Sequence, residues 1–304
     1  MGEVRMNCQR DRACAPSRAS ARAHSGQVVT SRTSLHRASS RRAQPRLQDG
    51  GYGTDVGPYA IAHRGGAGLA PENTIEAFTR SVSLGVRYLE TDVQLTADGV
   101  LVAFHDERVD RVTNLRGRVD QLSWSTLRGA TVGGAGSVLS LPDLLDAFPR
   151  MHFAIDLKTS AGIEPLVRVL KDSGSIERVC VAGAWDGWLA HLRAACGPGL
   201  RTALGWRSLT MLVGCAKAGV RPPVSVATGE FVHVPVSLGR VPLVADRLVR
   251  MAADLGVRVL VWTVDEPSLM HRLLDLGVDG VITDRPDLLR EVLVQRGQWR
   301  PMAD

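Results

Sequence analysis

The sequence predicts a single-domain α/β protein with the fold of a TIM, or (β/α)8, barrel. From Tyr59 onward, short apolar runs alternate with helix-like segments, a pattern typical of a parallel sheet covered by helices. About eight strands fall within roughly 240 residues, which suits a closed barrel better than an open doubly wound sheet. Polar residues gather at the ends of the early strands, where barrels of this kind carry their active sites.

The first 57 residues differ in composition from the rest of the 304-residue chain. Residues 1–50 hold ten arginines against three acidic residues, a net charge of +7, whereas the remainder has a net charge of −1. This part has no apolar periodicity, so we expect a disordered Arg/Ser-rich extension over residues 1–57. The barrel is predicted to span residues 58–297, followed by a tail at 298–304.

Composition also argues against several classes of protein. The barrel region is close to neutral, so its charge predicts no binding to nucleic acid. No run approaches the ~18 apolar residues of a membrane span, and the N-terminus lacks the apolar core of a secretory signal. A cytoplasmic protein is therefore expected. The five scattered cysteines, without any CxxC pair, predict neither a disulfide framework nor a zinc site. The oligomeric state is not predicted.

The first half of the predicted barrel contains a long turn-rich stretch. Pro71 opens a helix that ends at Gly85, and Gly99 marks a turn between two strands. Residues 106–140 are rich in glycine and irregular in pattern, so they predict a small insertion after the third strand. The elements expected here are strand 59–64, helix 75–82, strand 87–96, strand 100–105 and helix 141–148.

The second half alternates regularly between apolar strands and helices with apolar residues three or four positions apart. The expected strands are 153–157, 179–182, 201–204, 224–236, 258–264 and 280–283. The expected helices are 163–171, 187–196, 209–218, 243–255, 267–276 and 287–294.

Two carboxylates on one strand are the centre of the predicted site. Glu90 and Asp92 are two positions apart on strand 87–96, so both side chains project to one face. Charges among apolar neighbours are costly unless they are compensated, and a hard divalent cation takes oxygen ligands. Asp156, at the end of strand 153–157, offers a third carboxylate. An ion-pair network with Arg64 and Lys158, without a metal, is the alternative interpretation.

Basic groups and imidazoles lie at the same predicted end of the barrel. His63 and Arg64 close the first strand, His105 closes strand 100–105, and Lys158 follows Asp156. Arginine and lysine neutralise phosphoryl oxygens while carboxylates hold a cation. The combination predicts a site that handles phosphate.

Seven motifs, in order along the chain, resemble those of the glycerophosphodiester phosphodiesterase family. They are His63-Arg-Gly65, Pro71-Glu-Asn-Thr74, Glu90-Thr-Asp92, His105-Asp106, Asp156-Leu-Lys158, Trp262-Thr-Val264 and Gly280-Val-Ile-Thr-Asp-Arg-Pro286. The resemblance runs from about Tyr59 to Leu289. It implies a TIM barrel with a small insertion, and metal-dependent hydrolysis of small-molecule glycerophosphodiesters to glycerol 3-phosphate and an alcohol.

The resemblance also implies a role for each residue that matches a motif. His63 and His105 would act as general acid and base, without an assignment of which is which. The remaining roles are metal ligands at Glu90, Asp92 and Asp156, phosphate binding at Arg64 and Lys158, and a candidate substrate contact at Trp262. The cofactor implied is one divalent cation, Mg²⁺ or Ca²⁺. The family pattern has Glu where this chain has Asp156, which puts the affinity for the metal in doubt.

Two other functions stay open at this point. A phospholipase D-like enzyme acting on intact phospholipids or lysophospholipids would need an exposed apolar rim, for which the insertion offers Leu115, Leu122, Trp124 and Leu127. A catalytically silent barrel that binds phosphorylated ligands is the second alternative. Glu72 is interpreted as a helix-start residue, and the histidines outside the motifs, His233 among them, as surface or structural.

Overall fold

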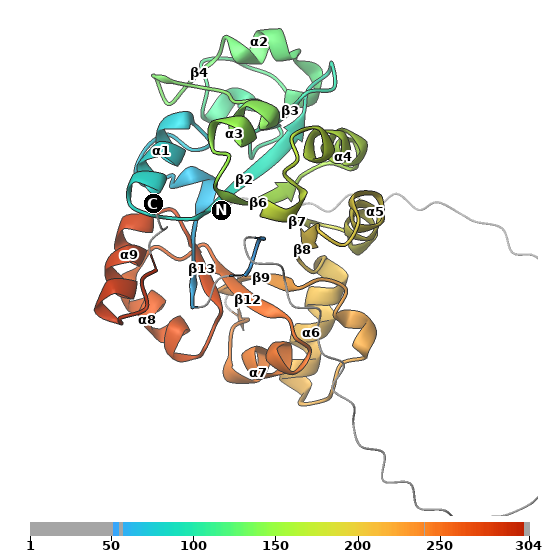
Figure 1. Ribbon diagram of the computed structural model, residues 1–304, viewed down its shortest axis with the longest axis vertical. Helices are drawn as coiled ribbons and strands as arrows, with labels where there is room; N and C mark the ends of the chain where they lie inside the picture. Colours follow the sequence, from blue (N-terminus) through green and yellow to red (C-terminus); the bar gives the residue numbers. More distant parts are fainter. Residues whose placement is uncertain (1–50, 55–56, 240, 301–304) are drawn as a thin grey trace, which may run out of the picture. The chain divides into compact units, whose positions relative to one another are not determined.

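The structure is a computed structural model that describes residues 51–54, 57–239 and 241–300. Within these ranges the chain forms the predicted barrel (Figure 1). Eight parallel strands lie in the order β8-β7-β6-β2-β1-β13-β12-β9, and a bridge between Ala203 and Phe231 brings its two ends together. Their bounds are β1 Tyr59–Ala62, β2 Tyr88–Leu95, β6 His152–Leu157, β7 Val179–Gly183, β8 Arg201–Thr202, β9 Phe231–Pro235, β12 Arg258–Trp262 and β13 Gly280–Thr283.

Helices surround the strands (Figure 1). Each of them buries one apolar face, as α4 does with Leu166, Val167 and Leu170. Their bounds are α1 Ile75–Ser83, α3 Leu141–Ala147, α4 Ile163–Asp172, α5 Asp186–Cys196, α6 Trp206–Ala218, α7 Asp246–Asp254, α8 Pro267–Asp275 and α9 Pro286–Gln295. Inside the described ranges, no helix combines the length and the apolar composition that a membrane span requires.

Several predicted boundaries differ from the structure, and two of them bear on the site. The strand expected over residues 224–236 is confined to Phe231–Pro235, and Val224–Val226 forms a short 3-10 helix instead. Prolines at 222 and 223 cannot donate to a ladder, and Gly229 lies so close to the chain that an added Cβ would be 2.5 Å from the carbonyl oxygen of Thr202. Helix α6 starts at Trp206, three residues before its expected start, and this places Trp206 beside the end of β8.

The segment expected as the third barrel strand, residues 100–105, is not part of the barrel wall. Its strand β3, Leu101–Ala103, pairs antiparallel with the end of β2, with Val93 opposite Ala103. The turn between the two is short, and Gly99 adopts φ 81° there. A short turn can join only antiparallel strands, whereas two parallel neighbours need a longer crossover connection. The next parallel strand beside β2 in the barrel wall is therefore β6.

The insertion over residues 106–140 packs around its own small core. Leu127 is fully buried there, and Leu115, Leu122 and Trp124 pack against the same cluster. Its regular elements are α2 Trp124–Arg128, β4 Thr131–Val132 and β5 Gly136–Ser137, and a further hairpin, β10 Ser237–Leu238 with β11 Val241–Pro242, follows β9. The four residues suggested as an apolar rim thus turn towards the insertion core.

An aromatic layer fills the barrel interior at the N-terminal ends of the strands. Tyr52 is fully buried, with its ring centroid 5.1 Å from that of Tyr88 and 5.2 Å from that of Phe231. The carbonyl oxygen of Gly53 accepts hydrogen bonds from the hydroxyl of Tyr59 and the guanidinium of Arg258. Residues 51–54 therefore belong to the fold, although they lie in the predicted extension. Residues 1–50 lie outside the described residues.

Candidate active site

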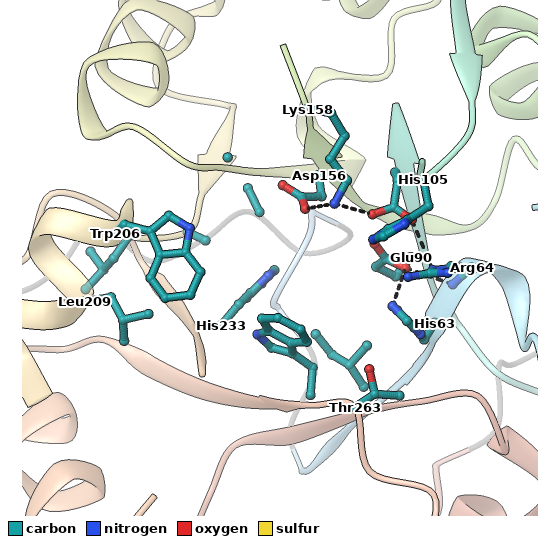
Figure 2. Close-up of a pocket in the computed structure, with 17 residues that line it drawn as sticks. His63, Arg64, Glu90, His105, Asp156, Lys158, Trp206, Leu209, His233 and Thr263 are labelled. Atoms are coloured by element: carbon teal, nitrogen blue, oxygen red, sulfur yellow. Dashed lines mark hydrogen bonds and ion pairs between the residues drawn. The ribbon is translucent and has the colours of Figure 1, made fainter. Parts of the chain in front are cut away.

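A cavity of about 180 Å³ lies at the C-terminal ends of the barrel strands (Figure 2). Its walls include all eight residues that the sequence predicted for the site: His63, Arg64, Glu90, Asp92, His105, Asp156, Lys158 and Trp262. The strands bring these side chains together from positions up to two hundred residues apart. The structure thus confirms that they are neighbours and leaves their chemical roles as predictions.

The carboxylates of β2 are almost wholly buried. Glu90 and Asp92 are 6% and 2% exposed, and Asp92 lies opposite Asp156 of β6 in the strand register. Burial and the nearby Asp92 raise the pKa of Glu90 to about 7, although His63 and a backbone hydrogen bond from Arg64 oppose the rise. Burial also disfavours the Asp92 anion, but Lys158, His105 and Arg64 outweigh it and lower the pKa of Asp92.

Arg64 reaches both carboxylates because its backbone has an unusual conformation. Its φ is 50°, in the left-handed region that few non-glycine residues adopt. In that conformation its N–H donates to Oε2 of Glu90 at 2.8 Å, and its Nε lies 3.3 Å from Oδ2 of Asp92. Its Nη1 also donates to Glu72 at 3.1 Å. Gly65 follows, where a Cβ would come 2.9 Å from the ring of Phe78.

His63 is held by a carboxylate that the sequence did not single out. Nδ1 of His63 lies 2.7 Å from Oδ1 of Asp284, and its Nε2 lies 3.9 Å from Oε2 of Glu90. Burial opposes the charged imidazolium, but Glu90 and Asp284 outweigh it, so the pKa of His63 is raised. Asp284 lies in the motif Gly280–Pro286, so the sequence could have indicated that this residue belongs to the site.

His105 has a similar partner next to it in the chain. Its Nδ1 lies 2.7 Å from Oδ1 of Asp106, and Asp106 accepts a hydrogen bond from Nε of Arg111 at 2.6 Å. Arg111 also donates to both oxygens of Glu72. The helix-start interpretation of Glu72 is wrong, because α1 begins at Ile75 and Thr74 caps it. Glu72 instead links the insertion to Arg64.

The donor set fits a hard cation in its chemistry, but not as a preformed site. Three carboxylates border the cavity, and Oδ2 of Asp92 is buried without a hydrogen-bond partner among the described residues. However, Nζ of Lys158 lies 2.7 Å from Asp92 and 2.6 Å from Asp156. In the described part of the chain, no group of three or more His, Cys, Asp or Glu side chains is arranged to hold a metal ion.

Sequence reasoning missed the apolar wall of the cavity. Trp206, Leu209 and His233 line it together with Trp262. Trp206 was missed because the expected helix started three residues later. His233 was interpreted as surface or structural. It is two positions from Phe231 on one strand, so both side chains project to the same face, and this alternation could have indicated its position.

Comparison with known proteins identifies the family. The model described as "Glycerophosphoryl diester phosphodiesterase family" matches residues 63–288. The chain belongs to this family. The "Probable glycerophosphodiester phosphodiesterase 2" of Mycobacterium tuberculosis is 39% identical over 265 residues, which are 83% of this chain and 99% of that protein. The glycerophosphodiester phosphodiesterase of Caldanaerobacter subterraneus is 32% identical over 253 residues, 78% of this chain and 98% of that protein.

A solved structure agrees with this assignment at the level of the fold. The glycerophosphodiester phosphodiesterase of Agrobacterium tumefaciens superimposes with a TM-score of 0.63 at 23% identity, over 76% of this chain and 98% of that one. This match confirms the expected barrel, and the family model and the relatives confirm the expected family. The chain is an enzyme of this phosphodiesterase family.

Proposed function

We propose that this phosphodiesterase hydrolyses glycerophosphodiesters to glycerol 3-phosphate and an alcohol, with His63 and His105 as general acid and base and one divalent cation. One observation carries the proposal: each histidine is held at Nδ1 by a carboxylate 2.7 Å away, on the wall of a single cavity. Such a partner fixes the ring and the proton on Nδ1, and it leaves Nε2 for the substrate.

The two imidazoles suit the proton transfers of phosphodiester cleavage. One would accept the proton of the attacking hydroxyl, and the other would give a proton to the departing alkoxide oxygen. An imidazole nitrogen can either accept or donate a proton, so the same kind of side chain suits both roles. Arg64 and Lys158 border the same cavity and would neutralise charge on the phosphoryl oxygens.

Glu90, Asp92 and Asp156 would hold the cation, Mg²⁺ or Ca²⁺. A bound cation supplies positive charge that stabilises negative charge on the phosphoryl group. The raised pKa of Glu90 supports the proposal, because it indicates that this buried carboxylate lacks sufficient compensating positive charge. Lys158 now contacts two of the three carboxylates, so it would have to share or release them.

The test is release of glycerol 3-phosphate from glycerophosphocholine, with EDTA and with added Mg²⁺ or Ca²⁺. We expect turnover that EDTA abolishes and a cation restores, and loss of turnover in His63→Ala and in His105→Ala. Activity that survives in both histidine variants would contradict the two-histidine mechanism, and activity indifferent to EDTA would contradict the cation. Absence of turnover with any metal would favour a silent barrel.

Lysophosphatidylcholine serves as the second substrate in this assay. Turnover of that lipid, but not of the deacylated diester, would contradict the proposed substrate class. The apolar residues of the insertion pack against its own core, and this favours the deacylated diester.

A further inference from the structure

The cavity has a second wall that the proposed proton transfers do not use. Trp206 and Leu209 of α6 and His233 of β9 lie across the cavity from His63 and Arg64 (Figure 2). Trp262, at the end of the neighbouring strand β12, also lines the cavity. None of these residues carries a formal charge when His233 is neutral, so the cavity has one ionic half and one aromatic half.

The aromatic half owes its space to small residues in the barrel interior. Ala182 of β7 and Ala203, just after β8, occupy interior positions beside this wall. In the strand register, the position level with Ala182 holds Asp156 on β6 and Asp92 on β2. The alanines therefore fill less of the cavity beside this wall than carboxylate side chains would.

His233 projects into the barrel because of strand alternation. Its neighbours Val232 and Val234 pack in the cluster between strands and helices, whereas Phe231 packs in the interior cluster. His233 therefore lies on the inner face, one layer nearer the C-terminal end than Phe231. Burial lowers the pKa of His233 to about 4, so the ring is neutral near pH 7.

The Nε2 atom of His233 is buried and has no hydrogen-bond partner within the described residues. An unpaired buried polar atom costs free energy, and a ligand that supplies the missing hydrogen bond removes that cost. A neutral imidazole in a cavity that two tryptophans also line offers one hydrogen bond and apolar contact. An acyl chain or a trimethylammonium group would leave Nε2 unpaired, and an anionic group would meet no positive charge on this wall.

We propose that the wall formed by Trp206, Trp262 and His233 is the subsite for a hydroxyl-bearing carbon arm of the phosphodiester, with His233 as the residue that pairs with the terminal hydroxyl of that arm. The inference rests on the proposed function and deepens it, since it places one arm of the substrate. Two arms have this chemistry: the glyceryl group, and a leaving alcohol that itself carries hydroxyls. The experiment distinguishes them.

The experiment compares kcat/KM for three phosphodiesters. Glycerophosphocholine has its free hydroxyls in the glyceryl arm, its 1-deoxy analogue keeps only the 2-hydroxyl, and glycerophosphoglycerol adds hydroxyls to the leaving alcohol. We expect His233→Leu to lower kcat/KM for glycerophosphocholine about tenfold, chiefly through KM, and to leave the deoxy analogue nearly unchanged. His233→Gln, which can still form a hydrogen bond, should recover part of the loss.

The tryptophans provide a matched pair of variants. Trp206→Ala should lower kcat/KM for all three substrates, because apolar contact does not depend on one hydroxyl. Trp185→Ala should change none of them: Trp185 is 62% exposed on the neighbouring loop and does not line the cavity. Thermal unfolding of each variant checks that the fold is retained.

Each result decides the inference. The leaving alcohol occupies the subsite if His233→Leu lowers kcat/KM only for glycerophosphoglycerol and so removes a preference for it over glycerophosphocholine. An equal factor for all substrates, or no change in a folded variant, would overturn the subsite while the proposed function stands.

A binding measurement separates this inference from failure of the proposed function. In His105→Ala protein, calorimetry with glycerol 3-phosphate and with inorganic phosphate needs no turnover. If the glyceryl arm occupies the subsite, adding His233→Leu should weaken glycerol 3-phosphate about tenfold and leave phosphate unchanged. Equal weakening of both would overturn the assignment of His233 to a hydroxyl. If the leaving alcohol occupies the subsite, the affinities for glycerol 3-phosphate and for phosphate should both stay unchanged. Unchanged affinities together with unchanged substrate preferences would overturn the inference.

Discussion

Nδ1 of His63 lies 2.7 Å from Oδ1 of Asp284, a residue 221 positions further along the chain. The two residues meet because each follows one of two paired strands: Ala62 of β1 is in register with Thr283 of β13. The N–H of Asp284 donates to Asp265 at 2.8 Å, which fixes this loop. The closing strand of the barrel thus orients a residue that follows the opening strand.

Asp284→Asn should lower kcat about 10- to 100-fold, because an amide can keep the ring in place but cannot stabilise its charged form. KM for glycerophosphocholine and Tm should change little, since His63 and its loop remain. Steady-state kinetics with thermal unfolding measures all three. Asp287→Asn is the matched control, because Asp287, in the first turn of α9, pairs with Arg285 and not with His63. Wild-type kcat in Asp284→Asn would refute the positioning role.

Lys158 compensates the charge of Asp92, so its replacement reports on the cation site. Lys158→Met leaves the Asp92 carboxylate buried and should lower the free energy of unfolding by about 3–5 kcal/mol in EDTA. If the carboxylates bind a cation, Mg²⁺ or Ca²⁺ should raise Tm more in this variant than in the wild type. The measurement is thermal unfolding with and without each metal.

The exposed Lys171 provides the control for this experiment. Lys171→Met should show neither the loss of stability nor the additional response to metal. A Lys158→Met protein whose Tm does not respond to either cation would speak against Glu90, Asp92 and Asp156 as ligands.

The alternation of residue types along the sequence predicted the features that depend on local geometry. The two-residue repeat of β2 placed Glu90 and Asp92 on one face, and the alternation of strands and helices predicted the barrel. Contacts set by strand order were less accessible: no local pattern specifies that Asp284 meets His63, since this depends on the pairing of β1 with β13. The placement of residues 100–105 in the barrel failed because an apolar run does not reveal the direction in which its strand pairs.

Composition also failed at Tyr52. The Arg/Ser-rich surroundings of this residue predicted an extension, yet its ring closes the N-terminal end of the barrel interior. The buried ring of Tyr52 and the hydrogen bonds to the carbonyl of Gly53 hold these residues, and a composition averaged over fifty residues does not detect such contacts.

Tyr52 allows a sharp test of that packing. Its hydroxyl is buried without a hydrogen-bond partner in the described part of the chain, while its ring makes edge contacts with Tyr88 and Phe231. Tyr52→Phe should leave the free energy of unfolding unchanged or raise it by up to about 1 kcal/mol, because it removes an unpaired polar atom. Tyr52→Ala should lower it by about 3–5 kcal/mol. Denaturant unfolding compares the two, and a destabilised Tyr52→Phe would show that the hydroxyl is paired.

The neutral state of His233 should make the fold sensitive to acid. Its pKa is about 4 in the folded protein against an ordinary value of 6.5. Between pH 6.5 and pH 4, His233 is protonated in the unfolded chain but stays neutral in the folded chain. The free energy of unfolding therefore falls as the pH drops from about 6.5 to about 4. At pH 5 the loss from this residue is about 2 kcal/mol.

His233→Gln should therefore lose about 2 kcal/mol less than the wild type between pH 7.5 and pH 5, measured by denaturant unfolding at both pH values. His191→Gln, at an exposed histidine of α5, should follow the wild type, and equal losses in all three proteins would contradict a buried neutral His233.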